Sequence, residues 1–266
     1  MKELKHEASS VVDELTLFDD DLMSRVFDNN IEATELVLRI ILRRKIKVIS
    51  AEGQDELKNH EVGGRNITLD VHAIDVDGKE IDIEVQSNAE GANVKRARFH
   101  SSMVDSRMLK EGQSFKELKD SYVIFMYKHD KFKKGLPLYH VERYVSETEE
   151  MFEDGSHIIY VNGNYKGTDD IGKLISDFHQ EKPENMYYDE LAQGVKHFKL
   201  VKGGHKQMSE KVERFAREYA KEYAVNEMAN CVSNVMKNMK CTLDQALHAM
   251  GIQGEEEKQI KEILQK

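Results

Sequence analysis

Apolar residues recur every three to four positions in several parts of the chain, and this spacing predicts helices that bury one face. The stretches with this spacing are 19–27, 31–42, 92–112 and 169–178. Asp19–Asp21 begin the first stretch and offer side chains for its N-cap. Gly112 ends the third stretch, because glycine is a common residue just past the end of a helix.

Other stretches have the composition of strands. Ser121–Tyr127 is apolar throughout, which is typical of a central strand that is covered on both faces. Shorter strands are predicted over residues 46–49, 138–144 and 157–161. Helices and strands are therefore mixed along the chain, and their order predicts an α/β core.

Residues 67–86 predict a β-hairpin. In its two strands the odd positions 67, 69, 71, 81, 83 and 85 are apolar, and the even positions 70, 72, 82, 84 and 86 are polar. The two apolar sets share a face only if odd positions pair with odd ones, so the alternation fixes the register. A three-residue loop, Val76–Gly78, gives this pairing and places Gly78 where such loops need a left-handed residue. Asp70 is then opposite Glu84.

Asp70 and Glu84 share the polar face of this hairpin, with Gln86 two residues further along. Opposed Cβ atoms lie about 4.5–5.5 Å apart, so two carboxylates there repel each other unless a cation lies between them. Mg²⁺ prefers carboxylate oxygen ligands and would fill that place. A solvated acidic strand face is the alternative, and the residues alone leave both interpretations open.

The segment "LDVHAIDVDGKEIDIEVQ" resembles the active-site hairpin of the PD-(D/E)XK nuclease superfamily. More narrowly, it is similar to the Rpn-type recombination-promoting nucleases, often described as transposases, in which Glu-x-Gln replaces the usual Glu-x-Lys. "FDDDLMSRVF" is similar to the opening helix of that family, and Lys95–Tyr127 to the helix and core strand after its hairpin. The resemblance covers about residues 18–200 and implies a restriction-endonuclease-like fold: a mixed central sheet flanked by helices.

The resemblance also implies roles for individual residues. Asp70 and Glu84 would hold Mg²⁺ or another divalent cation, and Gln86 would take the third catalytic place. An amide can position water or a phosphate oxygen, but it is not a useful base. Acidic residues of the opening helix sometimes complete such sites, so Asp21 is an additional candidate, with a role at the helix N-terminus as its alternative.

Lys95 and Arg98 lie near one face of the helix after the hairpin. They are candidates for contacts with DNA phosphates, and an ordinary solvated helix face is the alternative. The net charge of −10 counts mildly against DNA as a partner, because nucleic-acid binders are typically basic. A local basic patch can nevertheless be sufficient.

The chain divides on pattern into a polar, mobile N-terminus at 1–18, a nuclease-like domain at 19–204 and a helical extension at 205–266. In the extension, apolar residues from Val212 to Met239 form one stripe, which predicts a helix of about 30 residues. Two short helices are expected after it. The stripe predicts packing on the core or on a second subunit, and a homodimer would pair two active sites.

The composition sets the remaining limits. No apolar run approaches the roughly 20 residues that span a bilayer, and "MKELKHEASS" lacks the apolar part of a secretory signal. We therefore expect a cytoplasmic protein without a membrane partner. Cys231 and Cys241 have no CxxC spacing, so reduced thiols are expected rather than a zinc site.

Together these observations predict a Mg²⁺-dependent DNA endonuclease linked to recombination or mobile elements. A catalytically inactive nuclease-fold module that binds partners is the alternative, and the missing Lys and the acidic charge favour it slightly. The retained pair of Asp70 and Glu84 argues against it. Cleavage of RNA or of structured DNA is a third possibility.

Overall fold

The computed structural model describes residues 12–59, 63–88, 91–200, 225, 228–236, 239, 241–252 and 254–264. These residues fall into two compact units, one within residues 10–205 and one within the C-terminal part of the chain. Each unit is considered by itself. No helix among the described residues is long and apolar enough to cross a membrane.

The first unit is built on a six-stranded sheet with the order β1-β2-β3-β4-β8-β5. The first three strands are antiparallel, β3, β4 and β8 are parallel, and β5 returns antiparallel to β8. The strands are β1 (Val48–Leu57), β2 (Ile67–Asp75), β3 (Glu80–Gln86), β4 (Ser121–Tyr127), β5 (Leu138–Val141) and β8 (Ser156–Asn162). A separate two-stranded ribbon consists of β6 (Tyr144–Val145) and β7 (Glu150–Met151).

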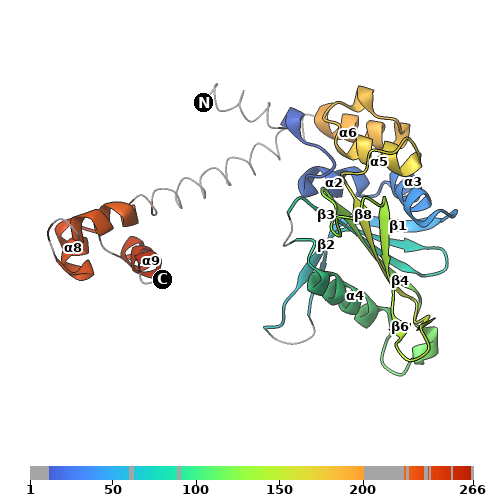
Figure 1. The fold of residues 1–266 in the computed structure, drawn as a ribbon, viewed down its shortest axis with the longest axis horizontal. Coiled ribbons are helices and arrows are strands. Elements are labelled where there is room, and N and C mark those ends of the chain that lie inside the picture. Colours follow the sequence, from blue (N-terminus) through green and yellow to red (C-terminus); the bar gives the residue numbers. More distant parts are fainter. Residues whose placement is uncertain are drawn as a thin grey trace. The chain divides into compact units, whose positions relative to one another are not determined.

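Helices cover both faces of this sheet, so β3 and β4 are buried at the centre of the unit (Figure 1). One face carries α4 (Val94–Met108), and the opposite face carries α2 (Asp20–Phe27) and α3 (Ile31–Leu42). Helices α5 (Asp170–Phe178) and α6 (Asp189–Leu200) pack beside α2 and α3. The predicted α/β, restriction-endonuclease-like fold is confirmed.

The sequence pattern located most of these elements. Helix α3 has the predicted bounds, and β4 does as well. The strand expected at 46–49 overlaps the beginning of β1, which starts at Val48 and continues to Leu57. That continuation was missed because it is an edge strand with alternately exposed polar residues, so no apolar alternation marks it. The helix α6 and the ribbon of β6 and β7 were also missed.

Part of the expected N-terminal segment belongs to the first unit. Residues 1–11 lie outside the described residues, but Val12, Leu17 and Phe18 are buried. Phe18 packs edge-on against Phe178 of α5, with ring centroids 5.6 Å apart. The apolar side chains of Val12, Leu17 and Phe18 are therefore part of the buried core.

The second unit is a small helical cluster. It contains α8 (Leu243–Ala249) and α9 (Glu255–Leu264), and residues 228–236 are also helical. Its buried residues come from these three segments and from Ile252 between α8 and α9; they are Ala229, Val232, Ala246, Leu247, Ile252 and Ile260. The two predicted short helices are present. Most of the predicted long helix, including residues 212–224, lies outside the described residues.

Candidate active site

The hairpin of β2 and β3 has the predicted register. Val71 pairs with Ile83 and His72 with Asp82. Gly78 has φ +77°, the left-handed conformation that the three-residue loop requires. The register therefore directs the side chains of Asp70 and Glu84 to the same place, just beyond the last of these pairs.

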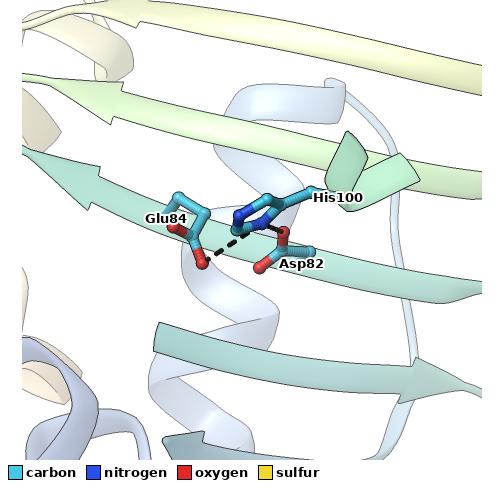
Figure 2. Close-up of side chains that lie close together, drawn as sticks. All are labelled: Asp82, Glu84 and His100. Atoms are coloured by element: carbon cyan, nitrogen blue, oxygen red, sulfur yellow. Dashed lines mark hydrogen bonds and ion pairs between the residues drawn. The ribbon is translucent and has the colours of Figure 1, made fainter. Parts of the chain in front are cut away.

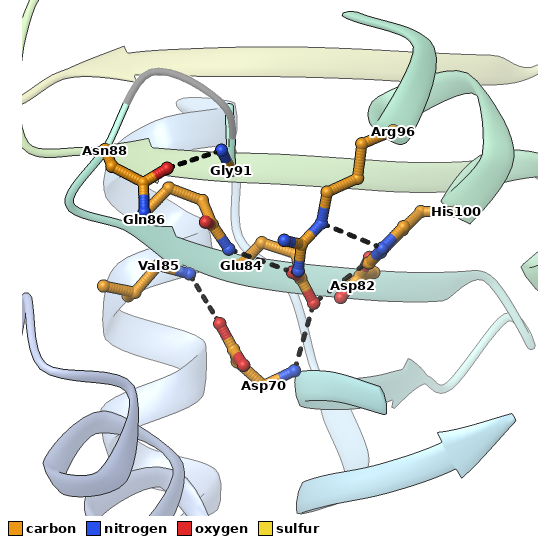
Figure 3. A network of polar contacts seen from close by, with 9 residues as sticks. All are labelled: Asp70, Asp82, Glu84, Val85, Gln86, Asn88, Gly91, Arg96 and His100. Carbon is orange, nitrogen blue, oxygen red and sulfur yellow. Dashed lines mark hydrogen bonds and ion pairs between the residues drawn. The ribbon is translucent and has the colours of Figure 1, made fainter. Parts of the chain in front are cut away.

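Beyond Val71 and Ile83, side-chain carboxylates replace the backbone ladder between the two strands. The backbone N–H of Asp70 donates to Glu84 Oε1 at 3.1 Å. In return, the backbone N–H of Val85 donates to Asp70 Oδ2 at 2.9 Å (Figure 3). These reciprocal hydrogen bonds fix both carboxylates and explain locally why acidic residues are stable at these two positions.

The acidic face of the hairpin is buried, so the solvated strand face considered above is excluded. Asp70 is 8% exposed, and Asp82 and Glu84 are 0% exposed. Burial, followed by the neighbouring Glu84 charge, raises the pKa of Asp70 to about 8. Burial, followed by the Asp82 charge, raises the pKa of Glu84 to about 8. The site therefore favours either protons or a cation.

Helix α4 supplies the cationic side of the site. Its N-cap Asn93 accepts a hydrogen bond from the backbone N–H of Lys95, and the helix packs against β3 and β4. Arg96 Nη2 lies 2.7 Å from Glu84 Oε2. The side chain of Arg96 is 38% exposed, whereas that of Glu84 is fully buried. A partly solvated guanidinium thus compensates a buried carboxylate.

Arg96 is in turn held by a buried pair. Its Nε donates to His100 Nε2 at 3.3 Å, and His100 Nδ1 lies 2.9 Å from Asp82 Oδ2 (Figure 3). Because His100 Nε2 accepts from Arg96, this hydrogen-bond network assigns the imidazole proton to Nδ1, which donates to Asp82. Asp82 Oδ1 is buried and has no hydrogen-bond partner among the described residues.

Two sets of donor atoms here could hold a divalent cation, and both include Glu84. Asp82, Glu84 and His100 offer ligand atoms that all lie within 4.8 Å of one another (Figure 2). In the tautomer assigned above, however, His100 Nδ1 has no lone pair to offer. The pair of Asp70 and Glu84 provides oxygen donors, which suit Mg²⁺. We therefore consider that pair the better fit.

An open pocket of about 850 Å³ lies beside these carboxylates. Polar side chains dominate its lining, which includes Asp20, Asp70, Gln86, Lys95, Arg96 and His100. Gln86 Nε2 lies 3.4 Å from Glu84 Oε2. A Cβ at Gly91 would overlap Gln86 Oε1, so the missing side chain at that position is what lets the Gln86 amide lie there.

The structure brings together Asp70, Glu84 and Gln86, as the sequence predicted, although their catalytic roles stay predictions. Lys95 lines the pocket and Arg98 does not, although both are exposed. Near the opening helix, the residue that lines the pocket is Asp20 rather than Asp21. The Asp20 charge also contributes to raising the pKa of Asp70.

Sequence reasoning missed the parts of the site that α4 and Asp82 supply. A signal was present, because Ala97, His100, Ser101 and Val104 recur at helical spacing and are buried. This spacing places His100 on the inner face of α4, and Arg96 one turn before it. The strand against which this face packs is not visible in a single sequence, so the contact with Glu84 could not be predicted.

The fold and the paired carboxylates define a nuclease-like protein of the restriction-endonuclease type. A model of the family described as PD-(D/E)XK nuclease family transposase matches residues 28–166, more than half of the chain. The chain belongs to this family, which confirms the resemblance found in the sequence. The matched range includes the hairpin and α4 but not Asp20 or Asp21. No curated protein and no solved structure matches the chain.

Proposed function

We propose that this protein is a divalent-cation-dependent endonuclease that hydrolyses phosphodiester bonds in DNA and acts in recombination or in the movement of mobile elements. One observation carries the proposal: two buried carboxyls from adjacent strands, Asp70 and Glu84, meet beside an open pocket in a member of a nuclease family. Burial without full compensation is costly for two carboxylates, and such sites are typically functional.

Asp70 and Glu84 would hold the cation, with Mg²⁺ the first candidate because the donors are carboxylate oxygens. A bound divalent cation supplies Lewis-acid polarisation of a phosphate oxygen and acidifies water. Gln86 lies beside Glu84 and lines the pocket, so its amide can orient water or a phosphate oxygen. In the reaction the oxygen of water forms a bond to phosphorus, one ester P–O bond breaks, and the leaving oxygen takes up a proton.

Contacts with the DNA backbone are proposed for Lys95, which lines the pocket, and more weakly for Arg98, which is exposed on the same helix. Their positive charges are local, which fits a chain whose net charge is negative. An inactive binding module remains the second candidate, because Gln86 stands in place of the Lys that most members of the superfamily use.

Cleavage of supercoiled plasmid by the full chain tests the proposal. We expect nicking or linearisation with Mg²⁺ and none with EDTA. Glu84→Gln keeps an oxygen for the Asp70 N–H but removes the charge. It should lower the cleavage rate by about a hundredfold or more. Loss of a residue that only hydrogen-bonds to a metal ligand already lowers metal affinity or activity about 10- to 100-fold, and Glu84 is proposed as a ligand itself.

Glu147→Gln is the matched control, because Glu147 is exposed and lies outside the pocket. It should cleave like the wild type. Cleavage that survives Glu84→Gln would mean that the site is placed wrongly. A folded wild type that neither cleaves nor binds Mg²⁺ in calorimetry would favour the binding module.

A further inference from the structure

We infer that Arg96 is the residue that contacts the scissile phosphate in this site, and that His100 and Asp82 are positioning residues that hold its guanidinium. The inference rests on the proposed function. It assigns the contact with the phosphate that is cut to Arg96, whereas the sequence pattern gave phosphate contacts to Lys95 and Arg98. It is drawn from the contacts of α4 with β3 and from the exposure of one side chain.

The site contains a concentration of acidic groups next to a pocket that must admit an anion. Asp70, Asp82 and Glu84 are all buried there, and Gln86 at the third catalytic place is neutral. An entering phosphate would be repelled by uncompensated carboxylates. A divalent cation held by Asp70 and Glu84 would compensate part of this charge. A cationic side chain beside the reacting phosphate would compensate more of it, and the neutral Gln86 does not do so.

Arg96 can act as this cationic side chain because of where it lies and because it is partly exposed. Its guanidinium contacts Glu84 at 2.7 Å, and its side chain lines the pocket and is 38% exposed. A guanidinium has five N–H donors in a planar fork that matches phosphate geometry. The contacts with Glu84 and His100 involve Nη2 and Nε, so donors remain for a phosphate in the pocket.

The buried pair behind Arg96 explains how the guanidinium is oriented. His100 is 2% exposed and accepts from Arg96 Nε, while its Nδ1–H donates to Asp82, which is 0% exposed. The result is a continuous chain of polar contacts from Asp82 through His100 and Arg96 to Glu84 (Figure 3). Such support restricts a long side chain to one geometry, which is what a residue acting on a transition state requires.

Arg96 also contacts the oxygen that a cation would need. In the free protein its guanidinium compensates Glu84 Oε2, so it competes with a divalent cation for that atom. Release of this contact leaves the guanidinium free to turn to a phosphate while His100 still holds Nε. A purely structural counter-ion would behave differently, because its removal would weaken the site for metal and substrate alike.

The test compares Arg96→Met and Arg96→Lys with wild type in two measurements on the full chain. The first is binding of Mn²⁺ by calorimetry without DNA, and the second is kcat and KM for cleavage of a DNA duplex. We expect Arg96→Met to bind Mn²⁺ at least as tightly as wild type. Its kcat should fall about 10²–10³-fold, as when one oxyanion donor is removed. Arg96→Lys should recover part of the rate.

Arg107→Met is the matched control, because it removes an Arg from the same helix that contacts Asp55 and does not line the pocket. It should leave both measurements unchanged. The inference is overturned if Arg96→Met cleaves within threefold of wild type. It is equally overturned if Mn²⁺ binding and cleavage are lost together. A wild type without cleavage or Mn²⁺ binding would defeat the proposed function, and this inference with it.

A separate measurement tests the positioning roles of His100 and Asp82. Asp82→Asn keeps the shape of the side chain but weakens its hold on His100, so kcat should fall about tenfold with little change in KM. In the Arg96→Met background the same substitution should have no further effect on kcat, since positioning acts only through Arg96. An equal fall in kcat in both backgrounds would contradict the positioning role. If Arg96→Met does not fold, Arg96→Lys replaces it as the background.

Discussion

At the scale of single residues, the site is built from groups that serve the sheet and the pocket at once. Asp70 and Glu84 each accept a hydrogen bond from the opposite strand, and each is buried. Gln86 reaches the same pocket because the residue facing its amide is a glycine, Gly91. One added methyl group at Gly91 would therefore displace the Gln86 amide.

Gly91→Ala tests this sensitivity. The added Cβ would overlap Gln86 Oε1, so the amide must move out of its place beside Glu84. We expect cleavage to fall at least about tenfold while the free energy of unfolding falls by only about 1–3 kcal/mol, the usual cost of overpacking. Plasmid cleavage and urea denaturation measure the two effects. Gln86→Ala is the comparison, and an active Gly91→Ala would show that the amide position does not matter.

At the scale of elements, the helices differ in what their ends contribute. Helix α4 begins beside the site and presents Arg96 and His100 to β3. His179 caps the C-terminal end of helix α5. Its ring packs against that of Phe18, with centroids 4.6 Å apart. His179 Nε2–H donates to the carbonyl of Gly163 at 2.9 Å. We propose a role in chemistry for the residues at the first end, whereas the contacts at the second end stabilise the fold.

The end of α5 makes stability depend on pH. Burial lowers the pKa of His179 below its ordinary value of 6.5, so the unfolded chain binds a proton more readily than the folded one. The stabilising contribution is therefore present above pH 6.5 and is lost as the pH falls from 6.5 towards the lower folded pKa. Acidification should thus favour unfolding at this position.

His179→Gln keeps an N–H donor for Gly163 but does not titrate. Between about pH 7.5 and pH 5, wild type should lose more of its free energy of unfolding than this variant loses. Urea denaturation at a series of pH values measures both losses. Parallel pH curves for the two proteins would show that His179 does not contribute.

The sequence predicted elements where the signal was local. The odd and even alternation in the hairpin, with Gly78 at the turn, was sufficient for the register of β2 and β3. The burial of its acidic face was not predictable, because that depends on where α4 docks. For the same reason Asp82 and His100 went unrecognised as a pair, since they are 18 positions apart in the sequence.

At the scale of the whole molecule, each of the two units has its own core. The sheet and its helices are buried within residues 10–205, and the C-terminal helices bury their own apolar residues around Val232 and Leu247. A domain boundary is proposed at 204/205, and a homodimer is proposed through the C-terminal helices. These two proposals concern different units. Folding should need only the first, whereas pairing of two active sites should need the second.

A truncated chain that ends after His205 tests the two proposals separately. It should keep the thermal unfolding transition of the nuclease-like unit within a few degrees, because the core of that unit lies inside the fragment. In sedimentation, the full chain should be a dimer and the fragment a monomer. A fragment that fails to fold would reject the boundary, and a monomeric full chain would reject the proposed dimer.

The reciprocal hydrogen bonds of Asp70 and Glu84 have a consequence for how related sequences are interpreted. The sheet needs an acceptor oxygen at each of these two positions, and an amide provides one as well as a carboxylate does. A lineage that had stopped cutting DNA would therefore retain acceptors there for folding alone, and Asn or Gln would become acceptable. Under the proposed function, the negative charge rather than the oxygen is therefore what should separate sequences that cut DNA from inactive ones.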